Sequence, residues 1–284
     1  MNKFALLLVL VFVQGCAQKT KYGLLNPMGT FPSKLKEVSG LEIGNDNIWV
    51  IQDSGNKDEV YKVNSSGKII NSVKIGHAKN EDWEDLAMDN VGNLYIGDFG
   101  NNNNTRKNLT IYKVQKSELG KKEAHSKKIT FNYPEQKEFP PKKDSLLFDT
   151  EGFFHWKDSL YIFTKNRTRP YTGETLIYRV PDTEGDYVAE FLGPLFLCDR
   201  QDNCSVTGAD ISADGKTIAL LGYGTIFLLT EFEFPNLDQA KVQVIDLQYL
   251  SQIESISFKD ANTLLLADEE YKDVGRKLYS YKMD

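Results

Sequence analysis

The chain has 284 residues with a formal net charge of −6, and 40% of its residues are hydrophobic. This composition provides enough apolar side chains to bury a large globular core. The chain lacks the basic stripe that attracts phosphate backbones, so we expect no nucleic-acid partner.

The N-terminal residues indicate export from the cytoplasm. Lys3 precedes an apolar run over 4–13, which is too short to cross a bilayer by itself. The run leads to Gly15 and Cys16, and this layout resembles the bacterial lipoprotein signal, in which the cysteine receives a diacylglycerol and the preceding segment is removed. An ordinary cleaved signal with an incidental cysteine is the alternative.

These features divide the chain and predict its location. We expect a signal peptide over 1–15, lipidation of Cys16, a tether over 16–20 and a single domain over 21–284. The lipid would anchor the protein, as a monomer, to a membrane of the bacterial cell envelope, at the outer membrane or on the periplasmic face.

Short strands are predicted along the whole mature chain. Aliphatic and aromatic runs bounded by Asp, Asn and Gly recur, as at 47–51, 93–97, 159–163 and 263–267. Long helical periodicity is absent, so the sequence predicts an all-β domain.

The strands belong to a repeated unit. Each unit opens with a short motif, continues through an aliphatic strand, and reaches a third strand that usually contains a tyrosine. The opening motifs are Ser39-Gly40-Leu41, Glu84-Asp85-Leu86, Glu151-Gly152-Phe153, Thr207-Gly208-Ala209 and Glu254-Ser255-Ile256. Such repetition is typical of a β-propeller, here with five blades.

The two ends of the chain favour closure into a ring. The last repeat stops after its third strand, and a strand-like stretch over 21–25 precedes the first motif. We therefore expect the N-terminal strand to complete the last blade, which removes exposed sheet edges. Six blades are the alternative, if the segment 116–145 hides a further repeat; its Lys, Glu and Pro content favours an insertion in the second blade.

The first residues of the motifs predict a metal site. If each motif begins an innermost strand, five oxygen-bearing side chains surround the central channel at one height. They are Ser39, Glu84, Glu151, Thr207 and Glu254. Converging carboxylates repel one another unless a cation neutralises them, and hard oxygen ligands suit Ca²⁺. The alternative is that these side chains only hydrogen-bond backbone groups at the start of each inner strand.

The turns after the aliphatic strands are expected on the same side as this ring, because both lie at the same end of alternating strands. They bring acidic, basic and aromatic side chains to one face. The residues concerned are Asp53, Asp98, Lys165, Arg167, Tyr223, Asp268 and Glu270. A mixed set beside a metal is a candidate ligand site. Alternatively, these residues simply make favourable turns.

Two cysteines follow the predicted anchor. Cys198 and Cys204 bracket a short polar stretch, and in an oxidising compartment they can close a surface loop, so we expect a disulfide. Zinc is the alternative, but His77, His125 and His155 are scattered along the chain.

The motifs resemble the calcium-activated nucleotidases of the apyrase type. The order Ser, Glu, Glu, Ser/Thr, Glu and the stretches 39–63, 84–97 and 151–167 carry the resemblance, over about four of the expected blades. It implies a five-bladed propeller with channel calcium that hydrolyses nucleoside di- and triphosphates. The blade-opening Glu-Gly motif is also similar to that of the esterase-like phytase and SdiA-regulated propellers.

Some residues match the pattern of the nucleotidase family and others differ from it. The resemblance places Asp53 near the reacting phosphate, but Ser54 stands where the family has an arginine and Asp98 where it has a glycine. Lys165 and Arg167 would then supply the positive charge for a phosphate.

Two functions follow. As a phosphohydrolase, the protein would use calcium to hold a phosphorylated substrate, Asp53 to position water, and Lys165 and Arg167 to stabilise charge. As a binding module, the calcium would be structural, and the exposed face, with 101–104 and 116–145, would capture a small molecule, a glycan or a protein.

Overall fold

The computed structural model describes residues 22–44 and 47–283. The predicted signal peptide, the lipidation site Cys16 and the tether lie outside these residues. Within them the chain is built from strands, with one helical turn, α1 (Gln201–Cys204), and short 3₁₀ segments η1 (Lys116–Glu118), η2 (Lys143–Ser145) and η3 (Leu237–Gln239). No helix in this described part has the length and apolar character needed to span a membrane.

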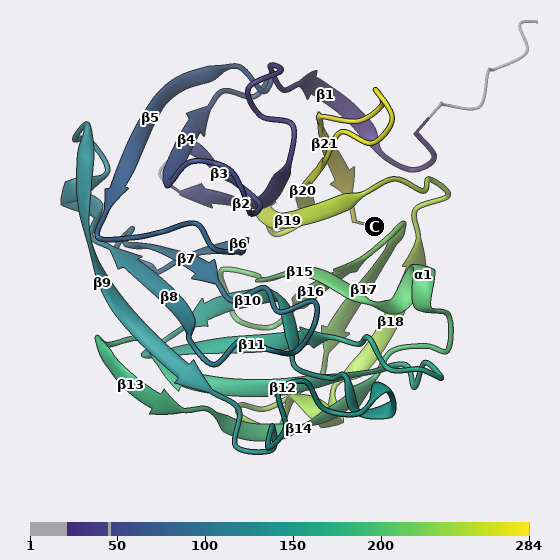
Figure 1. Ribbon diagram of the computed structural model, residues 1–284. Coiled ribbons are helices and arrows are strands. Elements are labelled where there is room, and N and C mark those ends of the chain that lie inside the picture. The colour runs from purple at the N-terminus through teal and green to yellow at the C-terminus, as the bar shows by residue number, and fades with distance from the viewer. Residues whose placement is uncertain (1–21, 45–46, 284) are drawn as a thin grey trace, which may run out of the picture.

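The described strands pair as antiparallel groups of four that follow one another around a ring (Figure 1). The first group is β2 (Val38–Gly44), β3 (Asn47–Gln52), β4 (Glu59–Val63) and β5 (Ile69–Gly76), and the second is β6 (Trp83–Met88), β7 (Leu94–Asp98), β8 (Leu109–Val114) and β9 (Glu123–Asn132). The third is β10 (Asp149–Trp156), β11 (Ser159–Lys165), β12 (Glu174–Pro181) and β14 (Glu190–Phe196). The fourth is β15 (Val206–Ile211), β16 (Ile218–Gly222), β17 (Thr225–Thr230) and β18 (Lys241–Asp246), and the last is β19 (Ile253–Asp260), β20 (Thr263–Asp268), β21 (Lys277–Lys282) and β1 (Asn26–Thr30).

The first strand of each group faces the centre of the ring. These inner strands contact one another in the order β2, β6, β10, β15, β19 and back to β2 (Figure 1). The fold is a β-propeller, as the sequence predicts. The second strands β7 and β16 are buried along their whole length, which explains why each begins with an apolar run, over 94–96 and 218–221.

Five hydrophobic clusters of described residues lie between successive groups and hold the ring together. Phe153 of the third group, for example, packs edge-to-face on Phe99, which follows β7, with 5.1 Å between ring centroids. The cluster that closes the ring joins Leu41 and Val50 of the first group to Leu265 and Leu278 of the last. Burial of apolar side chains between groups is therefore what stabilises the circle.

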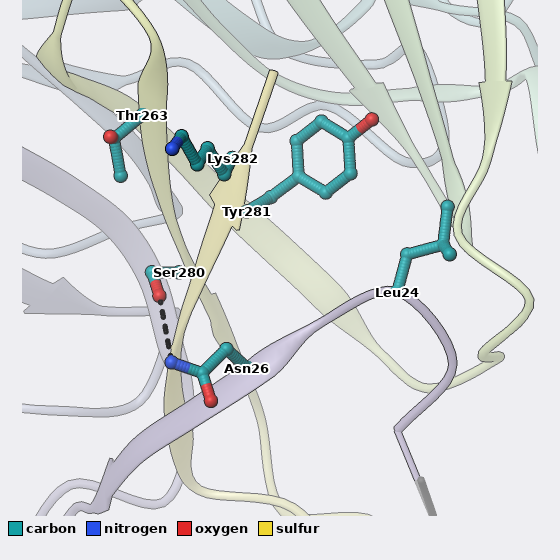
Figure 2. Close-up of a pocket in the computed structure, with 6 residues that line it drawn as sticks. All are labelled: Leu24, Asn26, Thr263, Ser280, Tyr281 and Lys282. Carbon is teal, nitrogen blue, oxygen red and sulfur yellow. Dashed lines mark hydrogen bonds between the residues drawn. The ribbon is translucent and has the colours of Figure 1, made fainter. Parts of the chain in front are cut away.

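The N-terminal strand completes the last group, but at a later position than the sequence predicts. Tyr22 to Leu24 form a turn, and the strand that pairs with β21 is β1, five residues on. Tyr22, which lies in the predicted strand, instead packs its ring against Tyr249 and Tyr279. Figure 2 shows the pairing region, where a pocket of about 440 Å³ lies beside the Asn26 Nδ2 to Ser280 Oγ hydrogen bond of 3.4 Å.

The segment 116–145 differs from the predicted insertion, because it supplies β9. This strand pairs with β8 antiparallel and then with β5 and β13 (Gly185–Val188) in parallel, so that the first two groups share a nine-stranded sheet. Ala124, Ile129 and Phe131 are buried and the lysines between them are largely exposed. Ala124 packs in one hydrophobic cluster and Ile129 and Phe131 in another, so the buried side of the strand changes along its length and no simple period-two pattern marks it.

Candidate functional site at the channel mouth

The five opening residues occupy equivalent positions. Each is the extra residue at a register shift between an inner strand and the second strand of its group. They are Ser39, Glu84, Glu151, Thr207 and Glu254, and each is less than a tenth exposed. A β-bulge leaves such a residue out of the ladder and re-aims its side chain, which is a recurrent device beside functional sites.

The two hydroxyl residues link neighbouring inner strands. Ser39 Oγ donates to the carbonyl of Trp83 at 2.7 Å, and Thr207 Oγ1 donates to the carbonyl of Ile253 at 3.0 Å. This is the backbone role that the sequence left open as the alternative. Each hydroxyl oxygen keeps lone pairs that can still coordinate a cation.

The glutamates of the ring crowd one another. Burial, and then the charge of Glu151, raise the pKa of Glu84 well above its usual value. Burial also raises the pKa of Glu151 to about 8, although the Lys165 ammonium opposes this, while Glu254 adds to it. Burial and mutual repulsion therefore oppose full ionisation of Glu84 and Glu151 in this part of the channel.

Both predicted catalytic cations are bound to carboxylates. Lys165 Nζ lies 3.0 Å from Glu151 Oε2, and Arg167 Nη2 lies 3.1 Å from Glu151 Oε1. Arg167 Nε also lies 2.6 Å from Asp149 Oδ2. The Lys165 side chain is 6% exposed and that of Arg167 30% exposed, so only the arginine is open to an incoming ligand.

Tyr223 joins this network, at the face where the sequence placed it. It accepts a hydrogen bond from Lys165 Nζ at 3.2 Å and donates one to Glu254 Oε1 at 2.9 Å. The chain of contacts from Glu151 through Lys165 and Tyr223 to Glu254 joins three groups of the ring. It restricts these side chains to defined positions around the mouth.

The densest carboxylate cluster lies between the first and second groups. Asp53, Asp82 and Glu84 each offer an oxygen within 4.8 Å of the others. Burial raises the pKa of Asp82 to about 7, and the charges of Asp53 and Asp149 raise it further. A Cβ at Gly100 would overlap the carboxyl groups of Asp82 and Glu84, so only glycine lets the backbone approach them.

Glu269, from the last group, also faces this mouth. Burial raises its pKa to about 10, with further contributions from Glu254, Asp53 and Glu37. Its Oε1 atom is buried and has no hydrogen-bond partner among the described residues. A buried carboxyl oxygen without a hydrogen-bond partner is stabilised by a bound proton or a cation.

Two residues predicted on the ligand face lie inside the groups instead. Asp98 is 2% exposed and Asp268 0% exposed. Asp268 Oδ2 accepts the hydroxyl of Tyr279 at 2.9 Å, and Asp98 Oδ2 accepts that of Tyr112 at 3.5 Å. In these two groups the last residue of the second strand thus binds the third-strand tyrosine, whereas Tyr178 of the third group donates to Glu135.

Glu270 lies at the rim rather than in the cluster. It pairs with Lys36 Nζ at 3.1 Å and with Arg276. The residue one position earlier, Glu269, is the one that reaches the channel mouth.

The acids that the sequence analysis missed have a recognisable spacing. An acidic residue stands two positions before the opening residue in the first three repeats, at Glu37, Asp82 and Asp149. The inner strand brings this position to the mouth together with the bulged residue. The signal was therefore an acidic residue at the same offset from the opening residue in three of the repeats.

The donor set fits a hard cation. The described residues of the cluster offer carboxylate oxygens, hydroxyl oxygens and one orphaned oxygen, with neither sulfur nor imidazole among them. Ca²⁺ accepts six to eight oxygen ligands of this kind in flexible geometry. Asp53, Asp82 and Glu84 would hold the ion. Asp149 lies close enough to raise the pKa of Glu84, and Asp53 lies close enough to raise that of Glu269.

The disulfide partners lie away from the cluster, before the fourth group. The structure joins Cys198 to Cys204 across α1, with 5.6 Å between their Cα atoms. This separation is ordinary for a disulfide.

No protein-family model and no curated protein matches the chain. An aldose sugar dehydrogenase from Streptomyces coelicolor, in its PQQ-bound form, is 8% identical with a TM-score of 0.49, over 92% of this chain and 98% of its own. A gluconolactonase from Xanthomonas campestris is 11% identical with a TM-score of 0.49, over 93% and 92%.

A virginiamycin B lyase from Staphylococcus aureus, with quinupristin, is 14% identical with a TM-score of 0.45. The match covers 87% of this chain and 66% of that one, so the chain spans about two thirds of the lyase. At these identities and scores no residue role or activity transfers to this chain.

Proposed function

We propose that the chain is a calcium-dependent ligand-binding module of the bacterial cell envelope, anchored through Cys16. The observation that carries the proposal is the meeting of Asp53, Asp82 and Glu84 within 4.8 Å. A divalent cation among these carboxylates would remove their mutual repulsion. When bound, calcium supplies a fixed positive charge that can receive an anionic or hydroxyl group of a ligand.

The surrounding side chains are suited to orienting a ligand. Arg167 is partly exposed and presents a guanidinium beside the cluster, while its ion pair with Asp149 holds it in place. Tyr223 is held by Lys165 and Glu254. A side chain that is already restrained loses little conformational freedom on binding, which favours recognition.

A calcium-dependent phosphohydrolase of the nucleotidase or phytase type is the second candidate. The position of Asp53 in the metal cluster favours it, because this residue could hold an attacking water molecule. The ion pairs of Lys165 and Arg167 argue against hydrolysis. A phosphate would have to compete with the carboxylates of Glu151 and Asp149 for these two cations. We therefore place binding first.

The propeller that we propose has five blades, each formed by one group of four strands. The same bulge in each inner strand and the hydrophobic clusters between groups support this count. The nine-stranded sheet would then be two blades joined at their outer strands β5 and β9. Parallel pairing between outer strands is extra to the four-stranded pattern of a blade.

Calorimetric titration with Ca²⁺ tests the proposal. We expect saturable binding by the wild type, binding weakened at least about tenfold by Glu84→Gln, which removes one charged ligand, and unchanged binding by Glu184→Gln, whose side chain is exposed. Absence of calcium binding by the folded wild type would overturn the metal site.

A phosphate-release assay with nucleotides and phytate separates the two functions. Under the binding-module proposal, the calcium-loaded protein releases no phosphate above the level of the Glu84→Gln variant. Calcium-dependent release that Asp53→Asn abolishes would replace binding with hydrolysis.

A further inference from the structure

A second cavity lies at the other end of the channel. It has a volume of about 650 Å³. Its lining comes from the final residues of the inner strands, whereas the metal cluster lies at their first residues. Because all five described inner strands run in the same direction along the channel, the two sites are at opposite mouths.

Two buried carboxyl groups meet in this cavity. Glu42 is 7% exposed and Asp210 9% exposed, and neither has an ion-pair partner among the described residues. Burial, and then the charge of Asp210, raise the pKa of Glu42 well above its usual value, and burial raises that of Asp210 to about 6. The pair is therefore an uncompensated acidic site in a low-dielectric wall.

One of these carboxyl oxygens is unpartnered. Glu42 Oε1 accepts hydrogen bonds from Ile43 N at 2.6 Å and Ser257 Oγ at 3.1 Å. Glu42 Oε2 accepts none from any residue that the structure describes, although the residue lines the cavity. Each Asp210 oxygen accepts one backbone hydrogen bond, from Ile211 N at 2.7 Å and from Phe258 N at 2.6 Å, which holds the carboxylate in place and leaves it able to accept another.

The remaining wall is aromatic and apolar. Trp156, Phe258 and Met88 contribute to it. The Trp156 ring is stacked on Phe234 with 5.7 Å between centroids, and it lies over Gly215, where a Cβ would overlap it. Its indole nitrogen is buried and has no acceptor among the described residues. Aromatic faces attract organic cations more than bare metal ions, which require several oxygen ligands.

The other charged groups around the cavity do not neutralise the pair. His155 Nε2 is engaged by Asp182 at 3.1 Å. The side chain of Asp89 is bound to Asn93 at 2.7 Å. The remaining charged lining residues are Lys157, Asp214, Lys259 and Asp260, which are exposed or partly exposed at the rim.

We propose that this cavity binds a small organic cation carrying a primary ammonium group, with the ammonium between Glu42 and Asp210 and the organic part against Trp156. Glu42 Oε2 supplies the free acceptor for the ammonium. This site is independent of the calcium site and of the function proposed for it.

Benzylamine and benzyl alcohol are the probes for this proposal, because they share a ring and differ in the charged group. Saturation-transfer NMR on the purified chain should show saturable binding of benzylamine and at least about tenfold weaker binding of benzyl alcohol, the loss expected when a charge-assisted hydrogen bond is removed. Equal binding of the two probes would overturn the proposal, and this comparison needs no variant.

Variants locate the binding. Glu42→Gln should weaken benzylamine at least about tenfold, and Asp210→Asn provides the same test if the first variant does not fold. Glu184→Gln, on the exposed surface, should leave binding unchanged. Retention of benzylamine binding by folded Glu42→Gln and Asp210→Asn proteins contradicts the site, as does displacement of benzylamine by Ca²⁺ alone.

Discussion

At the scale of single residues, the metal cluster depends on charges that the chain itself only partly balances. Lys165 is almost fully buried and lies against Glu151, while no cation among the described residues pairs directly with Asp53 or Glu84. Removing one member of a buried pair leaves the other charge uncompensated, which costs more than the pair itself contributes. Buried Lys165 should therefore be a structural requirement as well as a part of the site.

Replacement of Lys165 tests this requirement. We expect Lys165→Met to lower the free energy of unfolding by about 3 kcal/mol, because Glu151 loses its nearest cation. Lys241→Met is the matched control, since Lys241 and Glu231 form an exposed pair worth less than about 1 kcal/mol. Urea unfolding of both variants measures the difference, and equal losses would contradict the buried role.

Substitution of Gly100 tests the geometry of the metal cluster without removing a metal ligand. Gly100→Ala should weaken calcium binding by about tenfold, because the added methyl group displaces the carboxyl groups of Asp82 and Glu84. Gly120→Ala is the control, since a Cβ there meets no atom within 4 Å. Calorimetry on both proteins is the measurement; unchanged affinity in Gly100→Ala would place the ion elsewhere.

At the scale of elements, the same device recurs in each group. The bulge at the start of the inner strand turns one oxygen-bearing side chain toward the mouth, and the end of the second strand anchors the third-strand tyrosine in two groups. The residue after the second strand faces the mouth in the first, fourth and last groups, as Asp53, Tyr223 and Glu269 show, whereas in the third group it is the last strand residue, Lys165. The end of a second strand can thus provide both a hydrogen bond inside its group and a side chain at the channel mouth.

The anchoring tyrosine can be tested in the last group. Tyr279→Phe removes the hydroxyl that Asp268 accepts at 2.9 Å and should lower the free energy of unfolding by about 1 kcal/mol. The loss is modest because Ser251 and Lys277 still donate to Asp268. Tyr187→Phe, which affects a largely exposed contact with Thr183, should cost less in the same urea titration.

At the scale of the whole molecule, the two mouths of the channel bear acidic groups whose protonation is linked to folding. The pKa of Asp82 is raised to about 7, that of Glu151 to about 8 and that of Asp210 to about 6. In the unfolded chain these groups lose their protons near pH 4, so above that pH the folded state binds more protons than the unfolded state.

The stability of the cation-free protein should therefore fall as the pH rises from about 5 to about 8. We expect the thermal midpoint in EDTA to drop on the order of 5 °C over this range. Millimolar calcium should remove the part of this drop that is due to Asp82, a proposed calcium ligand, and leave the part due to Asp210, which lies at the other mouth. A midpoint that rises with pH in EDTA would refute the linkage.

Much of the fold and part of the site followed from local pattern. The all-β class, the repeat and the opening residues, such as Glu84 and Glu151, could be read because strand periodicity and motif spacing lie within short stretches. The strand β9 was not predicted because its buried residues change sides along its length, so no alternation of apolar residues marks it. Asp82 and Glu269 were missed because neither is exceptional within its own stretch of sequence.

The sequence by itself determined that this chain forms repeated antiparallel strands and brings one oxygen-bearing residue per repeat to an equivalent position. Only the tertiary structure decided which oxygens meet, because Asp53 and Asp82 come from different groups and approach one another only when the ring closes. The tertiary structure also determined that Lys165 forms an ion pair with Glu151, and that Glu42 and Asp210 lie near one another at the opposite mouth of the channel. Charge partners between groups depend on packing, and packing is set by the hydrophobic clusters that join the groups.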